Sequence, residues 1–231
     1  LLLGQTQRAQ AAAEEANTFK SRLLGIASHD LKSPLRTMLA RARQIEPELV
    51  ASPAGTAALN ELRGDGERLL GFVHDLLDVS AIEGGELRLT LAPVDLGALT
   101  AEVGRTLGPA ARAKAQTLTL EIPPAPVTVT GDRARLHQVI SNLVGNAVKF
   151  SPPGKPIVVR VTRGETEAVL TVRDEGPGLS TEDLAKIYAP FQPLSAAPTG
   201  GESSTGLGLH ICRDLVARHS GRIEVDSAPG Q

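Results

Sequence analysis

Apolar or small side chains recur at alternating steps of three and four residues along two segments near the start of the chain. The two series are Leu24, Ser28, Leu31, Leu35, Met38, Ala42 and Ile45, then Leu59, Leu62, Gly66, Leu69, Val73, Leu76 and Ser80. This spacing predicts two bundle helices. Pro47, Pro53 and Gly55 lie between the series and predict the turn of an antiparallel helical hairpin.

A hairpin with one apolar stripe on each helix cannot close a hydrophobic core by itself. We therefore expect two copies of the chain to pair as a dimeric four-helix bundle. A hairpin packed against its own neighbouring domain is the alternative.

After the hairpin the pattern changes to short strands interleaved with helices. Runs rich in β-branched residues predict strands at 86–91, 117–122, 127–130, 156–162 and 168–174. Helical periodicity predicts helices at 96–107, 133–150, 181–188 and 206–219. The predicted class is α+β, in which the helical hairpin precedes an α/β sandwich with one mixed sheet and helices on one face. Gly84 and Gly85 are expected to end the second bundle helix, which divides the chain into domains at 1–82 and 86–231.

Composition narrows the function classes. The formal net charge is -2 and only 2% of the residues are aromatic, so we expect no nucleic-acid partner. The single cysteine, Cys212, excludes an intrachain disulfide and fits a reducing, cytoplasmic location. No apolar run approaches the roughly 20 residues that span a bilayer, so no membrane contact is expected within this sequence. The chain reads as part of a longer protein.

The first predicted helix carries His29 and Asp30 side by side. His29 follows seam position Ser28 and is expected to point outward beside the bundle interface. The ring of Pro34 clashes with the carbonyl of Asp30, at a cost of about 3 kcal/mol relative to Ala. An exposed imidazole and a carboxylate next to such a bend indicate a functional site, whereas an isolated surface histidine is usually only solvated.

Three polar side chains share one face of the helix predicted at 133–150. Asn142, Asn146 and Lys149 are spaced by four and three residues. The positions expected to pack inward are Leu136, Val139, Ile140, Leu143 and Ala147. Two asparagines one turn apart are unusual on an ordinary polar face, because Asn is unfavourable inside helices. Neutral carbonyl oxygens suit Mg²⁺, which takes few protein ligands, and Lys149 would meet phosphate as a point charge.

Two glycine-rich turns follow. Asp174 ends a predicted strand, and Gly176 and Gly178 after it allow the backbone to approach a flat ligand closely. The Asp174 carboxylate can accept a hydrogen bond from the exocyclic amino group of adenine. This signal is weak by itself, since turns commonly contain Asp and Gly. The second turn opens the helix at 206–219, and helix N-termini bind phosphate. Residues 190–205 between the turns are long, rich in Gly and Pro and typical of a lid.

Taken in order, these motifs resemble the catalytic core of a sensor histidine kinase over nearly the whole chain. The stretch SHDLKSPL resembles the family's H box, NLVGNAVKF its N box, DEGPGL its G1 box, YAPF its F box and STGLGL its G2 box. Five matches in order are much more specific than any one of them. The resemblance implies a dimerisation and phospho-acceptor hairpin followed by an ATP-binding domain, whose fold is shared with topoisomerase, chaperone and mismatch-repair ATPases.

The resemblance also implies roles for individual residues. His29 is implied to be the phospho-acceptor and Asp30 the acidic partner that activates it. Ser33 is implied to orient a water molecule that dephosphorylates the regulator, although a small residue is also simply tolerated before Pro34. Asn146 is implied to be the Mg²⁺ ligand. The implied ATP contacts are Asn142, Asn146, Lys149, Phe150, Asp174, Gly176, Gly178, Thr205, Gly206, Leu207 and Gly208.

The implied function is autophosphorylation of His29 from Mg-ATP and phosphotransfer to an Asp of a response regulator receiver domain, within a homodimer. One feature departs from the family. A basic residue often follows the F-box Phe, whereas Phe191 is followed by Gln192 and Pro193, and residues 190–205 contain no Lys or Arg. Two alternatives stay open: an ATPase that shares only the nucleotide fold, and a nucleotide-binding scaffold with little catalysis.

Overall fold

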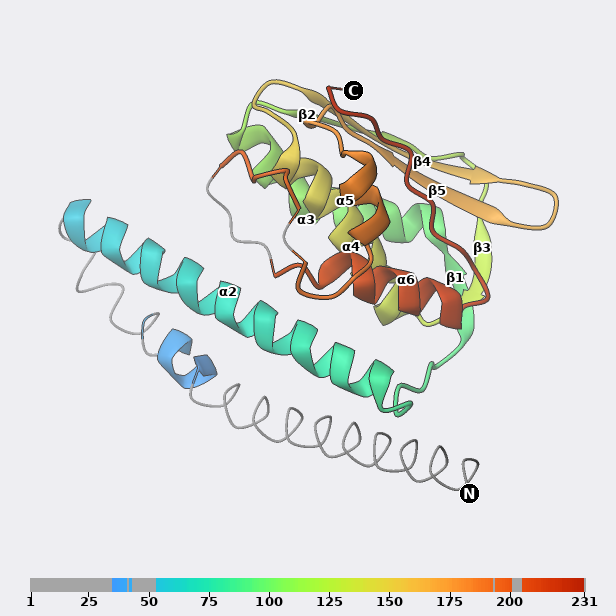
Figure 1. Ribbon diagram of the computed structural model, residues 1–231, viewed down its shortest axis with the longest axis horizontal. Coiled ribbons are helices and arrows are strands. Elements are labelled where there is room, and N and C mark those ends of the chain that lie inside the picture. Colours follow the sequence, from blue (N-terminus) through green and yellow to red (C-terminus); the bar gives the residue numbers. More distant parts are fainter. Residues whose placement is uncertain (1–34, 41, 43–52, 193, 201–204, 231) are drawn as a thin grey trace, which may run out of the picture. The chain divides into compact units, whose positions relative to one another are not determined.

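The chain forms two compact units, Leu1–Leu87 and Arg88–Gln231, which are described separately. The computed structural model describes residues 35–40, 42, 53–192, 194–200 and 205–230 (Figure 1). None of the helices in these ranges is long and apolar enough to cross a membrane.

The first unit contains the long helix α2, Pro53–Glu83, which confirms the second predicted bundle helix. Of the first predicted helix, residues 35–40 are helical, and the remainder lies almost entirely outside the described residues. At Gly66 an added Cβ would lie 2.6 Å from a methyl group of Leu39, so the seam glycine permits close packing between the helical segments. Gly85 ends α2 with φ +68°, and the amide of Glu86 donates to the carbonyl of Ala81.

The seam of the first unit is only partly covered. Val73 and Leu59 are buried, whereas Met38, Leu62 and Leu69 remain exposed to 67%, 56% and 49%. Large exposed apolar side chains at regular seam positions are typical of a surface that pairs with another copy.

The second unit contains the predicted mixed sheet. It has three strands in the order β2 (Thr117–Glu121), β4 (Pro156–Arg163) and β5 (Ala168–Arg173), with β2 parallel and β5 antiparallel to β4. A separate antiparallel pair joins β1 (Ala92–Asp95) to β3 (Thr128–Gly131).

The strand predicted at 86–91 is wrong. These residues form no regular element, and β1 begins only at Ala92. The register explains the difference, because Ala92 pairs with Gly131, and the next residue along, Asp132, is already the N-cap of the following helix. Residues before Ala92 therefore have no strand to pair with, and the amide of Thr90 donates instead to the Asp132 carboxylate, 2.9 Å away.

The helices of this unit are α3 (Leu96–Ala113), α4 (Arg133–Phe150), α5 (Thr181–Lys186) and α6 (Gly208–Arg218). Helices α3 and α4 lie on one face of the mixed sheet, and α6 packs against α4 (Figure 1). Helix α3 runs beyond its predicted end at residue 107 and contains Pro109. Because Ala111 beyond the proline is completely buried in an apolar cluster, packing outweighs the backbone hydrogen bond that Pro109 cannot make.

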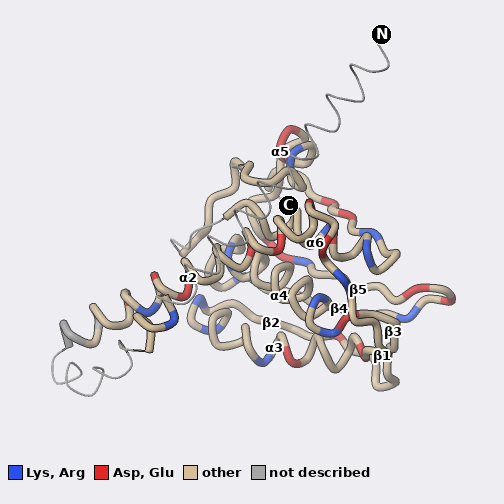
Figure 2. The backbone as a smooth tube through the Cα atoms, turned by 90° about the horizontal axis from the view of Figure 1, so that it is seen from below, with Lys and Arg blue, Asp and Glu red and all other residues tan. Residues whose placement is uncertain are grey.

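The core lies between the sheet and helices α3 and α4. Its buried members from these elements include Leu99, Val103, Ile140, Val144, Val159 and Val161. Each side chain of this size contributes about 1.5–3 kcal/mol when it is removed from water. Acidic and basic positions are interspersed over the unit (Figure 2), and exposed ion pairs such as Arg222–Glu167 join separate segments.

Candidate ATP site

Helix α4 presents the predicted polar face. Its N-terminus is capped by Asp132, whose carboxylate accepts from the amides of Ala134 and Arg135 at 3.0 and 3.2 Å. The apolar face buries Val139, Ile140, Val144, Ala147 and Val148. Leu143, predicted to be buried, is half-buried, because the stripe against the sheet runs through its neighbour Val144 instead. Asn142, Asn146 and Lys149 are all half-buried, so this face is neither core nor fully solvated.

The side-chain amide of Asn142 is the most informative polar group on that face. Its Nδ2 atom is buried and, among the described residues, finds no hydrogen-bond partner. A Cβ added to Gly208 would lie 3.7 Å from Nδ2, so Asn142 lies against the first residue of α6. A buried donor without a partner is costly, and its presence beside a helix N-terminus fits a site completed by a ligand.

The start of α6 offers further donors. Leu207, at the N-cap position, makes no side-chain cap hydrogen bond, although its own amide donates to Thr205 Oγ1 at 3.3 Å. Amide groups at such a helix start bind phosphate oxygens readily. Gly206 has φ +67°, and an added Cβ would lie 3.3 Å from the carbonyl oxygen of Gln192. The glycine of the G2 motif therefore lets this turn lie against the backbone of the F motif.

The backbone of the F motif is itself unusual. Phe191 has φ +58°, a left-handed conformation that bulky residues rarely adopt, and its side chain is 53% exposed. The motif begins at Tyr188, whose carbonyl accepts a hydrogen bond from Nδ1 of the buried His210 at 3.1 Å. His210 thus links α6 to the F motif.

Asp174 lies directly after β5 with one oxygen already engaged. Its Oδ1 accepts from the amide of Gly176 at 2.8 Å and from the hydroxyl of Ser151 at 3.3 Å. Both bonds orient the carboxylate through Oδ1, so Oδ2 is the oxygen suited to accept from a ligand. Ser151 comes from the C-terminal end of α4, so this contact fixes the acidic residue relative to the polar face.

The two glycines of the G1 motif are required by their surroundings. A Cβ on Gly176 would lie 2.7 Å from Asp174 Oδ1. Gly178 has φ +71°, and a Cβ there would lie 1.9 Å from the carbonyl oxygen of Ala228. The C-terminal segment is tied to this loop, since the amide of Gly230 donates to the carbonyl of Pro177 at 2.8 Å.

The C-terminal end of α4 completes the site. The ammonium group of Lys149 lies 5.3 Å from the centre of the Phe150 ring, within cation–π range. A Cβ on Gly176 would lie 3.5 Å from the carbonyl oxygen of Phe150, which places the G1 loop at this end of the helix.

The structure thus brings the N, G1, F and G2 motifs together around α4 and the start of α6. His29, Asp30 and Ser33 lie outside the described residues, so their roles stay predictions. Cys212 is completely buried. In the part of the chain that the structure describes, no cluster of three His, Cys, Asp or Glu side chains could hold a metal ion.

Both halves of the chain match families of known proteins. Residues 19–85 match the His Kinase A phospho-acceptor domain, and residues 131–231 match the histidine kinase-, DNA gyrase B-, and HSP90-like ATPases. The chain belongs to the histidine kinases. The first match covers the helical unit, and the second covers the part of the chain that contains the candidate site.

Individual relatives agree with this assignment. The histidine kinase core is 32% identical over 228 residues to the sensor protein GacS of Pseudomonas syringae pv. syringae, covering 96% of this chain but only 25% of GacS. The crystal structure of full-length ShkA in complex with AMPPNP matches with a TM-score of 0.73 at 30% identity, over 91% of this chain and 43% of ShkA. The histidine kinase AdeS of Acinetobacter baumannii matches with a TM-score of 0.59 at 25% identity, over 87% of this chain and 92% of AdeS.

Sequence reasoning missed a group of contacts at the edge of this site. Lys114, from the end of α3, donates to the carbonyls of Val148 and Lys149 at 2.8 and 3.1 Å. The amide nitrogen of buried Gln116 donates to the carbonyls of Val148 and Ser151 at 3.1 and 2.8 Å. Lys114 and Gln116 thus bind the carbonyls at the C-terminal end of α4. No local sequence pattern indicates these contacts, because both residues follow α3, which is distant in sequence from the end of α4.

Proposed function

We propose that this core is an ATP-dependent protein-histidine kinase that transfers the γ-phosphoryl group of Mg-ATP to His29 and then to an Asp of a response regulator receiver domain. Residues 1–82 would supply the acceptor and the homodimer interface, and residues 86–231 would bind ATP. The observation that carries the proposal is the buried Nδ2 atom of Asn142, which finds no hydrogen-bond partner among the described residues and lies beside the uncapped start of α6. The chain spans a quarter of the length of GacS.

Adenine recognition is assigned to the G1 end of the site. Asp174 Oδ2 would accept from the exocyclic amino group, while Gly176 and Ser151 hold Oδ1 in place. Gly176 and Gly178 would let the base lie close to the backbone, since side chains at both positions would meet neighbouring atoms. The crystal structure of ShkA, which contains AMPPNP, supports an adenine nucleotide as the ligand.

The phosphate end is assigned to α4 and α6. Asn146 would supply a carbonyl oxygen to Mg²⁺, while Asn142 and the turn of Thr205, Gly206, Leu207 and Gly208 would donate hydrogen bonds to phosphate oxygens. Lys149 would contribute positive charge, with Phe150 beside it. When bound, Mg²⁺ neutralises charge on the phosphates. The residue types fit this ion, because it prefers oxygen ligands and keeps most of its waters.

The chemistry at the acceptor follows from the imidazole. One ring nitrogen of His29 must be unprotonated to attack phosphorus in line with the departing ADP, so a P–N bond forms as the bond to ADP breaks. Asp30 would hold the proton on the other ring nitrogen and stabilise the imidazolium that develops. Transfer to the carboxylate of the receiver domain would then regenerate neutral His29. The part of Ser33 in later dephosphorylation stays a prediction.

A scaffold that binds nucleotide but turns over little is the second candidate. It is favoured by one observation, the absence of Lys and Arg from residues 190–205. If a basic group at the lid is needed during transfer, this core would bind ATP and phosphorylate itself poorly.

Incubation of the whole chain with γ-labelled Mg-ATP separates these functions. We expect acid-labile, alkali-stable label on the parent and none on His29→Ala, whose ATP affinity should be unchanged, because acceptor and nucleotide belong to different units. The Asn146→Ala variant should lose both the label and Mg²⁺-dependent binding. Label retained by His29→Ala would disprove the acceptor assignment. Binding without label in the parent would favour the scaffold, and release of free phosphate alone would indicate an ATPase.

A further inference from the structure

The described part of the loop between the F and G2 motifs is held by hydrogen bonds to the rest of the domain. We use the term lid segment for residues 194–200, which the structure describes. The loop carries no Lys or Arg, so its own side chains cannot form an ion pair with a phosphate. The lid segment is instead held at two separate points.

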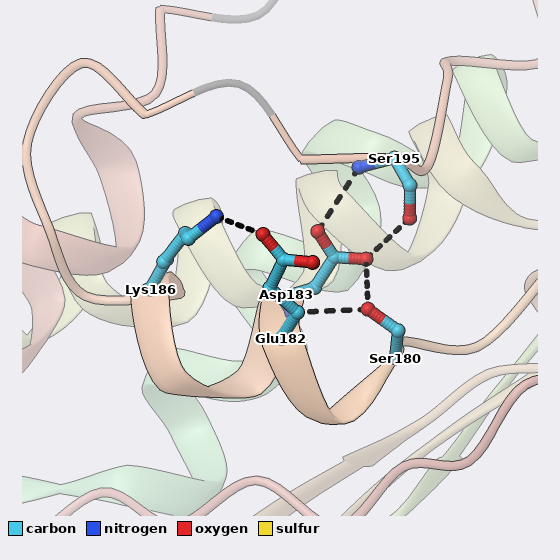
Figure 3. Close-up of polar contacts among 5 residues, drawn as sticks. All are labelled: Ser180, Glu182, Asp183, Lys186 and Ser195. Atoms are coloured by element: carbon cyan, nitrogen blue, oxygen red, sulfur yellow. Dashed lines mark hydrogen bonds and ion pairs between the residues drawn. The ribbon is translucent and has the colours of Figure 1, made fainter.

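The first point is the carboxylate of Asp183 on α5 (Figure 3). Its Oδ1 accepts from the amide of Ser195 at 3.2 Å, and its Oδ2 accepts from the hydroxyl of Ser195 and, at 2.9 Å, from that of Ser180. Asp183 is only 7% exposed. Hydrogen bonds from Ser195 and then Ser180 hold the pKa of Asp183 below its usual value, so the carboxylate is charged at neutral pH.

The Asp183 carboxylate makes hydrogen bonds beyond its own helix. Ser180 Oγ accepts from the Asp183 amide at 3.0 Å, which makes the N-cap of α5. An acid at this position commonly reaches back to the N-cap amide in a capping box, but Asp183 accepts from a loop residue 12 positions later. The nearby cation Lys186 pairs with Glu182 (Figure 3). Ser195 is thus the partner that joins α5 to the lid segment.

The second point is Thr199, at the other end of the lid segment. Its amide donates to the carbonyl of Lys149 at 3.0 Å, and its hydroxyl lies 2.9 Å from the carbonyl of Ser151. The ammonium group of Lys114 donates to Thr199 Oγ1 at 2.7 Å and also to the carbonyl of Lys149. The lid segment is therefore attached to the end of the helix that carries the N-box residues.

We propose that Asp183 and Lys114 are positioning residues that fix the lid segment before the nucleotide binds, in place of a lid cation drawn in by the phosphates. The inference rests on the proposed ATP binding of this site. Its physical basis is preorganisation, because a segment that is already ordered loses less conformational entropy when a ligand binds. In this core the anchoring charges lie on α5 and at the C-cap of α3, and the lid segment contributes only neutral donors and acceptors.

Ser195→Ala tests the first anchor, because it removes the lid hydroxyl and leaves α5 with its cap. Ser180→Ala is the matched control, since it removes the cap but keeps both bonds between Ser195 and Asp183. Amide hydrogen exchange of the whole chain, measured by NMR without nucleotide, should be about tenfold faster at position 195 in Ser195→Ala, the size of effect that one hydrogen bond to a charged group can have. Ser180→Ala should leave this exchange rate unchanged.

Lys114→Met tests the second anchor in the same way. It keeps the apolar stem and should accelerate exchange of the Thr199 amide by about tenfold. Ser195→Ala and Lys114→Met should each also bind a non-hydrolysable ATP analogue less tightly than the parent, whereas Ser180→Ala should bind it as tightly as the parent. Unchanged exchange at 195 and 199, or equal acceleration in Ser180→Ala, would overturn the inference. Because exchange is measured without nucleotide, this result is independent of whether the core phosphorylates itself, and a failure of the proposed kinase function would show only in the labelling experiment.

Discussion

At the residue scale, two glycines of the second unit adopt a left-handed backbone conformation in different surroundings. Gly154 and Gly178 both have positive φ, +80° and +71°. They differ in their surroundings, because no atom lies within 4 Å of a Cβ added to Gly154, whereas the carbonyl oxygen of Ala228 lies 1.9 Å from one added to Gly178. The first glycine is needed only for its backbone conformation, and the second also for space.

This contrast gives a pair of matched substitutions. Gly154→Ala should lower the free energy of unfolding by about 1–2 kcal/mol, the cost of a left-handed conformation for a residue with a Cβ. Gly178→Ala should cost more and should also weaken nucleotide binding, because the C-terminal segment and the G1 loop must separate. Urea unfolding followed by circular dichroism, with a nucleotide titration of each variant, measures both effects. Equal losses of stability in the two variants would show that the contact with Ala228 is unimportant.

The residues that the sequence could not reveal share one physical reason. Asn142, Asn146 and Asp174 were predicted because a polar face and a strand end are local patterns. Thr199 and Lys114 form a bond between positions separated by 85 residues, and the loop that contains Thr199 has no regular pattern. Such contacts depend on how the chain folds back on itself, so they become visible only in three dimensions.

At the element scale, four of the five predicted strands match β2, β3, β4 and β5 to within one residue at each end, whereas the first strand and the end of α3 differ from the prediction. The predicted helix at 133–150 has the same bounds as α4, because Asp132 is a strong N-cap and the apolar stripe is continuous. The first strand was misplaced, since alternation at 86–91 does not reveal whether a partner strand is present. The helix predicted at 96–107 likewise stops short of Ala113, because tertiary packing continues α3 through Pro109.

The cap of α4 leads to a prediction about pH. The backbone amide of Thr90, followed by those of Arg135 and Ala134, holds the pKa of Asp132 below its usual value of 3.8. Asp132→Ala should lower the free energy of unfolding by about 1 kcal/mol at pH 7. Because the folded-state pKa is the lower one, this stabilisation is fully present above pH 4 or so and is lost as the pH falls through the folded pKa.

Asp132→Asn is the control for this prediction, because asparagine caps helices about as well as aspartate but does not titrate. The free energy of unfolding of Asp132→Asn should be close to that of the parent at neutral pH. As the pH falls, this variant should lose less stability than the parent, because it has no carboxylate to protonate at position 132. Urea unfolding between pH 3 and pH 7 compares the three proteins. If Asp132→Ala and the parent differed by the same amount at every pH, the carboxylate charge would have no part in the cap.

At the scale of the whole molecule, the two units differ in how far the described apolar side chains are covered. The core of Arg88–Gln231 is enclosed by the sheet and its helices, whereas the helical unit exposes Met38, Leu62 and Leu69. The seam that produced the dimer prediction is therefore visible in the structure as uncovered apolar surface. The match to the phospho-acceptor family at residues 19–85 covers the same region.

Leu62 and Leu91 allow the dimer interface to be located within the whole chain. Both are 56% exposed, but Leu62 lies on the seam of α2 and Leu91 belongs to the second unit. Burial of a leucine contributes about 1.5–3 kcal/mol and a dimer would bury two copies of Leu62, so Leu62→Glu should raise the dimer dissociation constant about 100-fold or more. Leu91→Glu should leave it unchanged. Sedimentation velocity over a range of concentrations measures both, and dissociation caused by Leu91→Glu alone would place the interface in the ATP-binding unit.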